Sequence, residues 1–543
     1  MIGFNCKYAP LELFAGFGEE CFLLNDEAEN FDYSNSQLHP NMCSHAKAML
    51  QEINKGNFKE IILTDCCDSS RRVFDALNSD NGDFSYLLDL PSCDGECAVK
   101  KFSSELVNLI EKYEKYSGKK FDKEKFFNAF EEPVKIKSEK FVALMGARSS
   151  ASLLDVLKKC SPYPIVDLTC AANRSVAKPD VQIDDDTAKI MLKYASSLLR
   201  QTPCMRMQDN RARRALAENE NCEGIVYHTV KFCDYYDFEY SELKNLSVPI
   251  IKIETDFTKQ SYGQLLTRLE GFCETLGTEK KEKVQMKNGR YFAGVDSGST
   301  STELVVIDKE MNIVKQVTVR TGANAAAGAR KALEQSGVSL DDIACLIATG
   351  YGRKNIDFAD GDITEITCHA AGAKFLWKDV RNIIDIGGQD SKVICLDQDG
   401  RVTNFIMNDK CAAGTGRFLE NMAKVLETDM DTMAKVGLDY HKDLTISSMC
   451  TVFAESEVVS LIAENNSVSD IVHGLNKSVA AKTKALAGSV KDLKNVMMTG
   501  GVARNSGVVS ELEKLLNLKL YIPKYPECCG ALGAAVLAAR QGD

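Results

Sequence analysis

Apolar and polar residues follow two alternating patterns along the first half of this chain. Short apolar runs predict buried strands, among them EIILTD (60–65), YLLDLP (86–91) and FVALMG (141–146). Between them lie segments such as CAVKKFSSELVNLIEKYEKYSG (97–118), whose apolar residues fall on one face of a helix. This alternation predicts parallel sheets covered by helices on both faces. We therefore expect a two-lobed, doubly wound α/β domain, with one lobe at residues 1–138 and the other at 139–276.

A charged stretch separates this half from a second kind of pattern. GTEKKEKVQMKNG (277–289) lacks apolar periodicity and strand signals, so it predicts a linker. In the domain at 290–543, YFAGVDSGSTSTELVVID (291–308) is typical of strand, tight turn and strand. NIIDIGGQDSKVICLD (382–397) repeats that design, which indicates an α/β fold built by internal duplication.

Composition narrows the class of protein. With 543 residues, 44% hydrophobic and 26% charged, the chain is typical of a globular protein of several domains. It has no apolar run near the roughly 18 residues of a membrane span and no basic-then-apolar opening, so we expect a cytoplasmic protein without a membrane partner. The formal net charge of −11 argues against a nucleic-acid partner.

Cysteine is unusually frequent, with 20 residues. In a reducing compartment such thiols indicate metal or redox chemistry more often than disulfides. The alternative is that many are small buried hydrophobes, which we expect for roughly half to two-thirds of them.

The two predicted turns of the second half have residues suited to phosphate. In DSGST (296–300) the Gly lets the backbone approach phosphate oxygens, the Ser and Thr supply hydroxyls, and the Asp can hold a hydrated Mg²⁺. One such loop is also a common hairpin turn, but the near-copy DIGGQD (385–390) and GGVARN (500–505) make the pattern specific. Neither GxxxxGK[ST] nor GxGxxG is present, which excludes a Walker-type ATPase and a dinucleotide fold as explanations.

Two cysteines of this half precede predicted helices. Cys411 comes before AAGTGRFLENMAKVL, and Cys450 comes before TVFAESEVVSLIAE. Free N–H groups and the positive dipole end of a helix favour a thiolate and an anionic cluster. Two ligands per chain cannot complete a four-cysteine iron–sulfur site, so symmetry in a homodimer would supply the other two.

Other cysteines stand out by position in the first half: Cys43 in NMCSHA, Cys67 in DCCDSSRR and Cys233 in VKFCDYY. The pair Cys66–Cys67 follows one predicted strand and Cys233 follows another, so both fall at strand ends, where open α/β sheets bind ligands. Their spacing is not that of a zinc site. Cys93 and Cys97 have a CxxxC spacing that suits either a metal or the start of a helix.

The duplicated motifs resemble the fold of actin, sugar kinases and Hsp70-type ATPases, in which two α/β lobes close on Mg-ATP. The resemblance implies that Asp296 and Asp385 are metal-side carboxylates and that Gln389 positions water. It implies an ATP site formed by Gly298, Ser299, Thr300, Gly387, Gly388, Asp390, Gly500 and Gly501. The alternative is a kinase-like fold that binds no nucleotide.

The same half resembles a narrower family, the iron–sulfur activases of 2-hydroxyacyl-CoA dehydratases and benzoyl-CoA reductases. The match covers about Tyr291–Gln541 and rests on TGYGR (349–353), EITCHAAGA (365–373), DIGGQDSK, NDKCAAGTGRF and CTVFAESE. It implies ATP, Mg²⁺ and one 4Fe-4S cluster that bridges a homodimer through Cys411 and Cys450. It also implies a ferredoxin or flavodoxin electron donor and a separate dehydratase or reductase partner.

The first half is similar to the cluster-bearing subunit of those dehydratases, the D-component, and to double-cubane reductases. NMCSHA, CCDSSRR, RQTPCMRM and GIVYHTVKFCDYYDFE account for the similarity. It implies a second iron–sulfur cluster on Cys43, Cys67 and Cys233, with Cys66 as a rival to Cys67. Whether this half holds a 4Fe-4S cluster, a double cubane or no cluster stays open at this point.

Together these patterns favour ATP-dependent electron transfer at low potential, with the donor tethered to a domain like its usual acceptor. The compound that is reduced or dehydrated, a CoA thioester or another small molecule, is not determined by fold or cluster. One alternative is an activase for a separate dehydratase, with the first half as a docking module. An alternative of another class is a kinase-like transferase or nucleotide sensor without clusters.

Overall fold

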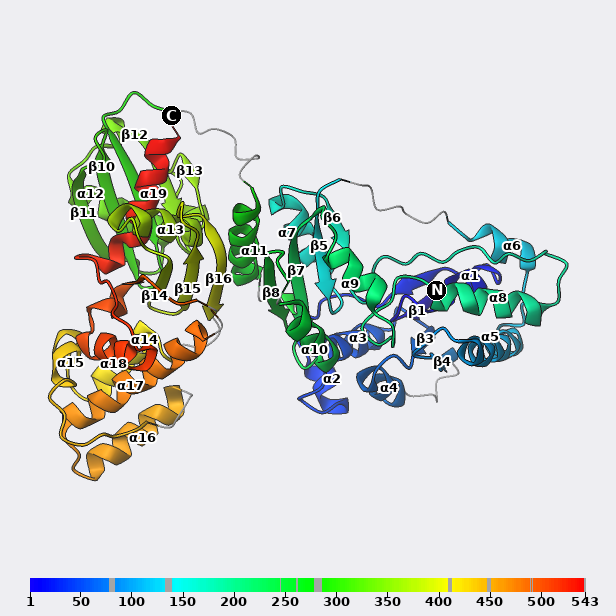
Figure 1. Cartoon of the computed structure of the whole chain (residues 1–543). Helices are drawn as coiled ribbons and strands as arrows, with labels where there is room; N and C mark the ends of the chain where they lie inside the picture. Colours follow the sequence, from blue (N-terminus) through cyan, green and yellow to red (C-terminus); the bar gives the residue numbers. More distant parts are fainter. Residues whose placement is uncertain are drawn as a thin grey trace. The chain divides into compact units, whose positions relative to one another are not determined.

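The chain forms two compact units, Met1–Phe272 and Cys273–Asp543, which we describe separately (Figure 1). The computed structural model describes residues 1–77, 84–131, 139–244, 246–259, 262–277, 286–408, 413–446, 451–488, 490 and 492–541. Residues 278–285 of the predicted linker lie outside these ranges. Within them, every helix is too short or too polar to cross a membrane.

The first unit contains two four-stranded sheets in which every strand pair is parallel. One has the order β2-β1-β3-β4, with β1 (Ile2–Phe4), β2 (Cys21–Leu23), β3 (Glu60–Thr64) and β4 (Phe84–Leu88). The other has the order β6-β5-β7-β8, with β5 (Phe141–Gly146), β6 (Ile165–Asp167), β7 (Cys222–Val230) and β8 (Ile250–Thr255). The helices are α1 (Leu11–Ala15), α2 (Asp32–Gln37), α3 (Ser44–Asn54), α4 (Asp68–Asp75), α5 (Glu96–Ser117), α6 (Lys123–Asn128), α7 (Ala151–Cys160), α8 (Thr187–Leu199), α9 (Arg211–Ala217), α10 (Asp234–Leu243) and α11 (Tyr262–Leu276).

This architecture confirms the predicted parallel α/β fold. All six residues of β5 are buried, because helices cover both faces of a parallel sheet and leave no polar face. The amphipathic helix α5 packs against α8, and its buried residues Phe102, Leu106 and Leu109 join the core beneath the first sheet. Helix α8 thus completes the core of the first sheet although it follows β5 and β6 in the chain.

The second unit contains two sheets of matching design. The first has the order β11-β10-β9-β12-β13, with β9 (Tyr291–Ser297), β10 (Ser301–Asp308), β11 (Ile313–Arg320), β12 (Ile343–Thr349) and β13 (Gly361–Asp362). The second has the order β16-β15-β14-β17, with β14 (Asn382–Ile386), β15 (Ser391–Leu396), β16 (Val402–Asn408) and β17 (Val496–Thr499). In both, three antiparallel strands lie beside one strand that returns parallel to the first, so the predicted duplication is confirmed.

Helices flank these two sheets (Figure 1). They are α12 (Ala325–Ser336), α13 (Glu365–Leu376), α14 (Gly416–Val425), α15 (Met430–Val436), α16 (Thr451–Ala463), α17 (Val468–Ala487), α18 (Ser506–Leu516) and α19 (Cys529–Arg540), with short 3₁₀ helices η3 (Leu340–Asp342), η4 (Arg353–Asn355), η5 (Gly501–Arg504) and η6 (Pro526–Cys528). The last helix, α19, packs against β9 and β12 of the first sheet and against α13.

Glycines allow α13 and α19 to approach closely. A Cβ at Gly533 would overlap the carbonyl oxygen of Cys368, and one at Gly372 would overlap that of Cys529. A Cβ at Gly530 would overlap Asp296. The two helices thus pack backbone to backbone, and Gly530 of α19 lies directly against Asp296 near the end of β9, where the first predicted phosphate loop begins.

We expect Gly533→Ala to destabilise the second unit by about 2 kcal/mol or more, because backbone atoms cannot yield to the added methyl group. The single tryptophan of the chain, Trp377, follows α13 and stacks on Tyr521, so its fluorescence reports on this unit alone. Urea unfolding followed by that fluorescence measures the change. Gly501→Ala is the matched control, because a Cβ there would have no described atom within 4 Å; equal midpoints for the two variants would contradict the packing argument.

Candidate functional site

The two predicted phosphate loops of the second unit face each other. They connect β9 with β10 and β14 with β15, and the Cα of Gly388 lies so close to Thr300 that a Cβ would overlap its hydroxyl. Ser299 and Gln389 are exposed at the loops, whereas Gly298, Thr300, Gly387 and Gly388 are half-buried. Residues far apart in the chain thus form one mouth between the duplicated sheets.

Each loop begins at a buried aspartate that a Thr-Gly pair accompanies. Asp385 is paired in register with Thr499, whose hydroxyl donates a 2.8 Å hydrogen bond to Asp385 Oδ1. Asp296 is paired in register with Thr349 on the other sheet. Gly350 and Gly500 follow these threonines with positive φ of 83° each, and a side chain at Gly350 would overlap Asp296. The duplication therefore includes a Thr-Gly element that sequence analysis did not single out, although TGYGR and TGGVAR both contain it.

Two buried bases lie among the carboxylates. Lys392 Nζ is 2.8 Å from Asp390 Oδ2, 3.2 Å from Asp385 Oδ2 and 3.3 Å from Glu365 Oε2. His369 lies between the two loop aspartates, with Nε2 at 3.9 Å from Asp296 Oδ2 and Nδ1 at 3.7 Å from Asp385 Oδ1. Neither base was predicted, although Lys392 is the last residue of DIGGQDSK and His369 lies in EITCHAAGA.

Four carboxyl groups surround the two bases Lys392 and His369, and this surplus of acids shifts the pKa values of the buried carboxyls. Burial alone would raise the pKa of Asp385, but His369, Lys392 and the Thr499 hydroxyl outweigh it and lower the pKa to about 2. Burial raises the pKa of Asp296, and it raises that of Glu365 to about 7. A surplus of buried carboxylates fits a divalent cation, and Asp296 and Asp385 are the predicted oxygen ligands for one.

The second phosphate loop is bonded directly to the start of α14. The backbone N–H of Gly416 donates to the carbonyl of Gly387, and that of Arg417 donates to Gly388, both at 2.9 Å. The predicted cluster ligands Cys411 and Cys450 lie outside the described residues, between β16 and α14 and immediately before α16. Gly500 follows β17, and Gly501 is exposed at the start of η5.

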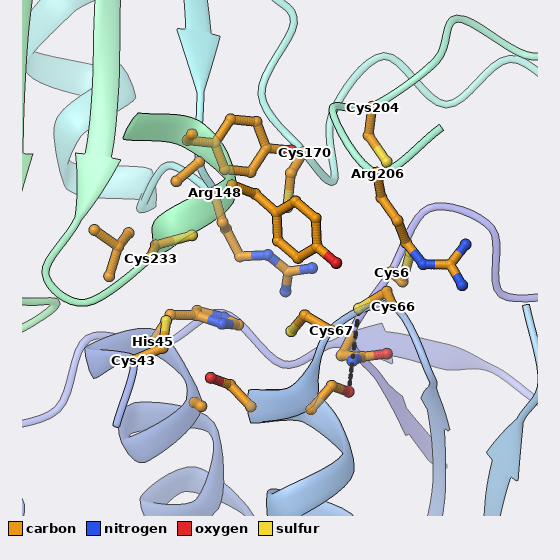
Figure 2. Close-up of a pocket in the computed structure, with 18 of the residues that line it drawn as sticks. Cys6, Cys43, His45, Cys66, Cys67, Arg148, Cys170, Cys204, Arg206 and Cys233 are labelled. Carbon is orange, nitrogen blue, oxygen red and sulfur yellow. Dashed lines mark hydrogen bonds between the residues drawn. The ribbon is translucent and has the colours of Figure 1, made fainter. Parts of the chain in front are cut away.

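The first unit gathers cysteines around one cavity of about 100 Å³, which we call the cysteine pocket (Figure 2). Seven cysteines line it: Cys6, Cys43, Cys66, Cys67, Cys170, Cys204 and Cys233. They include the three predicted cluster ligands, Cys43, Cys67 and Cys233. The residues after β1, β3, β5, β6 and β7 contribute to the lining, so the carboxyl edges of both parallel sheets meet here.

The three predicted cysteines share one further property, because each is the N-cap of a helix. Cys43 caps α3, Cys67 caps α4 and Cys233 caps α10. The positive ends of three helices therefore face the thiols and favour thiolates. A hydrogen bond from Cys233 lowers the pKa of Cys43 to about 7, and the same bond raises the pKa of Cys233.

Of the other four cysteines, Cys66 was predicted as a rival to Cys67, and Cys6, Cys170 and Cys204 were not assigned from the sequence. The hydrogen bond with Cys66 and burial raise the pKa of Cys6, and burial raises that of Cys204 to about 11. Cys6 and Cys170 follow β1 and β6, and the short apolar runs before them were the signal available. Cys93 is half-buried and Cys97 is exposed, and neither lines the cysteine pocket.

The donor set of the cysteine pocket suits an iron–sulfur group. Seven thiols and no described carboxylate line the cavity, and thiolates are the ligands of such clusters. Across the described ranges, no group of three His, Cys, Asp or Glu side chains is arranged to hold a metal ion.

These features define the class: a duplicated α/β fold of the actin, sugar kinase and Hsp70 type, joined to a two-lobed α/β unit that gathers cysteines. The family model described as the BadF/BadG/BcrA/BcrD ATPase family matches residues 293–538. The model described as 2-hydroxyglutaryl-CoA dehydratase, D-component, matches residues 6–145 and 142–276.

Relatives match the second unit along nearly their whole length. The 2-hydroxyisocaproyl-CoA dehydratase activator of Clostridioides difficile is 44% identical over 251 residues, which are 46% of this chain and 94% of the activator. The activator of lactoyl-CoA dehydratase of Anaerotignum propionicum is 47% identical over 251 residues, which are 46% of this chain and 97% of that protein. The solved structure of the C. difficile activator with bound ADPNP covers 46% of this chain and 95% of its own, with 44% identity and a TM-score of 0.45.

The chain belongs to the BadF/BadG/BcrA/BcrD ATPase family, and a D-component-like half is fused before the ATPase half. The predicted resemblance of both halves is confirmed.

We expect Cys43 to be the reactive thiol of iron-free protein, because its pKa of about 7 makes it half thiolate at neutral pH. Alkylation by iodoacetamide, followed at each cysteine by mass spectrometry, should give Cys43 a half-maximal rate near pH 7. Cys233→Ala removes the hydrogen bond and should move that midpoint up by about 1.5 units. Cys97→Ala, at an exposed cysteine, is the control; an unmoved midpoint in Cys233→Ala would contradict the pairing.

Proposed function

We propose that this protein uses ATP to drive electron transfer at low potential, from the ATPase unit to an iron–sulfur cluster in the cysteine pocket. One observation supports this most strongly. The second phosphate loop is hydrogen-bonded through Gly387 and Gly388 to the start of α14, the helix that follows Cys411. A nucleotide that moves the loop must therefore move the segment next to a proposed cluster ligand.

The proposed nucleotide site lies between the two phosphate loops. Gly298, Ser299, Thr300, Gly387, Gly388 and Asp390 would surround the phosphates, with Gly500 and Gly501 beside the adenosine. The activator from C. difficile was solved with bound ADPNP, and 95% of it aligns with the ATPase half of this chain at 44% identity. Gln389, which is exposed, would orient a water molecule toward the terminal phosphate.

The carboxylates of this site would hold the magnesium ion. Bound Mg²⁺ would neutralise charge on the transferred phosphoryl group. Asp385 is ionised at neutral pH because Lys392 and His369 lower its pKa, so it can bind the hydrated ion directly. Burial raises the pKa of Asp296, and a bound cation would lower it again by favouring the charged carboxylate. Lys392 holds Asp385 and Asp390 in position from beneath the loop.

The proposed donor cluster is shared between two chains. Cys411 and Cys450 would bind one 4Fe-4S cluster together with the same cysteines of a second copy, which makes a homodimer part of the function. A ferredoxin or flavodoxin would reduce it. Since the relatives are named as activators of dehydratases, a separate dehydratase or reductase remains a second candidate acceptor.

The proposed acceptor lies in the cysteine pocket. Cys43, Cys67 and Cys233, at three helix N-termini, would be the ligands of a 4Fe-4S cluster and leave one iron open. Four further cysteines line the same cavity. Since one such cluster uses at most four thiolates, the surplus favours a larger group, such as two joined cubanes, over a single one. The reduced compound would be a CoA thioester or another small molecule.

Iron analysis of anaerobically purified protein tests the two cluster sites separately. Replacing Cys411 and Cys450 together by Ser should remove about two iron atoms per chain, half of a shared cluster. Replacing Cys43 and Cys233 together by Ser should remove about four or more. Replacing the exposed Cys97 by Ser should remove none. An iron-free, colourless wild-type protein with vigorous phosphotransfer to a small molecule would refute the redox function.

We expect Asp385→Asn to slow ATP hydrolysis roughly 100-fold or more, because the ionised ligand for Mg²⁺ is lost. Iron content should not change, since the substitution leaves every proposed cluster ligand in place. ATP should alter the electron paramagnetic resonance spectrum of the reduced wild-type protein and not that of this variant. A spectrum of the wild-type protein that ignores ATP would contradict the proposed coupling.

A further inference from the structure

The lining of the cysteine pocket contains a cation with an unused hydrogen-bond donor. Arg148 follows β5, is 4% exposed and donates from Nη1 to the carbonyl of Leu24 at 2.9 Å. Its Nε is buried and has no hydrogen-bond partner among the described residues. Figure 2 shows the guanidinium reaching into the pocket between Cys67, Cys170 and His45.

The second arginine of the lining, Arg206, already has hydrogen-bond acceptors on the protein backbone. Arg206 donates to the carbonyl of Pro91 at 2.8 Å and also to that of Leu90. No aspartate or glutamate is among the described residues that line the pocket. Arg148 therefore lines the cavity with a buried Nε that has no described hydrogen-bond partner. The lining offers it no carboxylate, although Glu52, which is outside the lining, is near enough for the two charges to interact. A buried guanidinium in that state costs free energy until an anion binds.

Thiolates alone account poorly for this arrangement. The N-termini of α3, α4 and α10 already face Cys43, Cys67 and Cys233 and compensate their negative charge. A guanidinium offers donors in a planar fork, which matches a planar oxyanion with two acceptor oxygens and matches a sulfur atom less well. The carbonyl of Leu24 fixes the orientation of the fork before any ligand arrives.

We infer that Arg148 recognises a small planar oxyanion, a carboxylate or its equivalent, held against the cluster of the cysteine pocket. The cavity is about 100 Å³ without a cluster, so beside a cluster only a small group such as the oxyanion itself fits within it. The substrate of this unit would thus bear its negative charge next to the group that is reduced. This inference rests on the proposed function only in placing the oxyanion beside a cluster.

Calorimetric titration of the full, iron-loaded chain with formate tests the inference. The wild-type protein should bind formate in a saturable way, and formamide, which is neutral and of the same shape, should bind at least ten times more weakly. Arg148→Gln should lower the affinity for formate at least ten-fold with iron content unchanged. Arg148→Lys should also weaken binding, since an ammonium group lacks the fork. Arg206→Lys is the matched control and should change the affinity less than two-fold.

Acetate and a longer carboxylate such as hexanoate separate the two sources of the oxyanion. If the oxyanion is a whole small substrate, the affinity should fall steeply as the carboxylate becomes longer. If it is the ionised end of a larger molecule, the affinity should stay the same or rise. Unchanged formate affinity in Arg148→Gln would overturn the inference. Loss of iron from that variant would also overturn it, because Arg148 would then be a partner of the cluster.

The two proposals fail separately. Iron content and the spectrum of the pocket cluster report on the proposed function, and the formate titration reports on Arg148. A wild-type protein without pocket iron would refute the acceptor cluster, and the same titration on that protein would still decide whether Arg148 binds the anion.

Discussion

The second unit depends on placing two carboxylates of like charge at the ends of two buried strands, one from each of its sheets. Asp296 and Asp385 stand at the carboxyl ends of β9 and β14, where burial penalises their charged forms. Lys392 and His369 compensate part of that charge, and the glycines after β12 and β17 allow the backbone to approach. The remaining surplus of negative charge favours a divalent cation, which is consistent with the Mg²⁺ of the proposed function.

The first unit has the opposite electrostatic problem. Its parallel sheets direct their carboxyl edges, and the helix N-termini that follow them, at one cavity. Three cysteines cap those helices, two arginines join the lining, and none of the described lining residues is a carboxylate. Such a cavity favours anions, first thiolates and a cluster and then, by our inference, an oxyanion. The proposed cation site of the second unit is thus rich in carboxylates, and the pocket of the first unit, proposed to hold anionic groups, is lined by arginines.

One chain contains both the proposed nucleotide site and the cysteine pocket, because the D-component-like half is fused to the ATPase half. In the relatives, the activator is a protein of its own, and it aligns with 46% of this chain. A covalent link raises the concentration of one site near the other without any new contact between them. The hydrogen bonds from α14 to the loop of Gly387 and Gly388 offer a short physical route from nucleotide to Cys411, so that tethering and switching would act in series.

The sequence by itself determined the elements and the local chemistry. The period of apolar residues predicted the strands and the duplication, since burial of one or both faces leaves a local pattern. DSGST, DIGGQD and the strand-end positions of Cys67 and Cys233 could be recognised because a loop or strand end is continuous in the chain. Only the tertiary structure brought together Lys392 with three acids, His369 with both loop aspartates, and Arg148 with seven cysteines. Lys392 is close in sequence to Asp385 and Asp390, but Glu365, His369, Asp296 and the pocket cysteines come from distant segments. The charge and pKa values of these groups depend on neighbours that folding alone supplies.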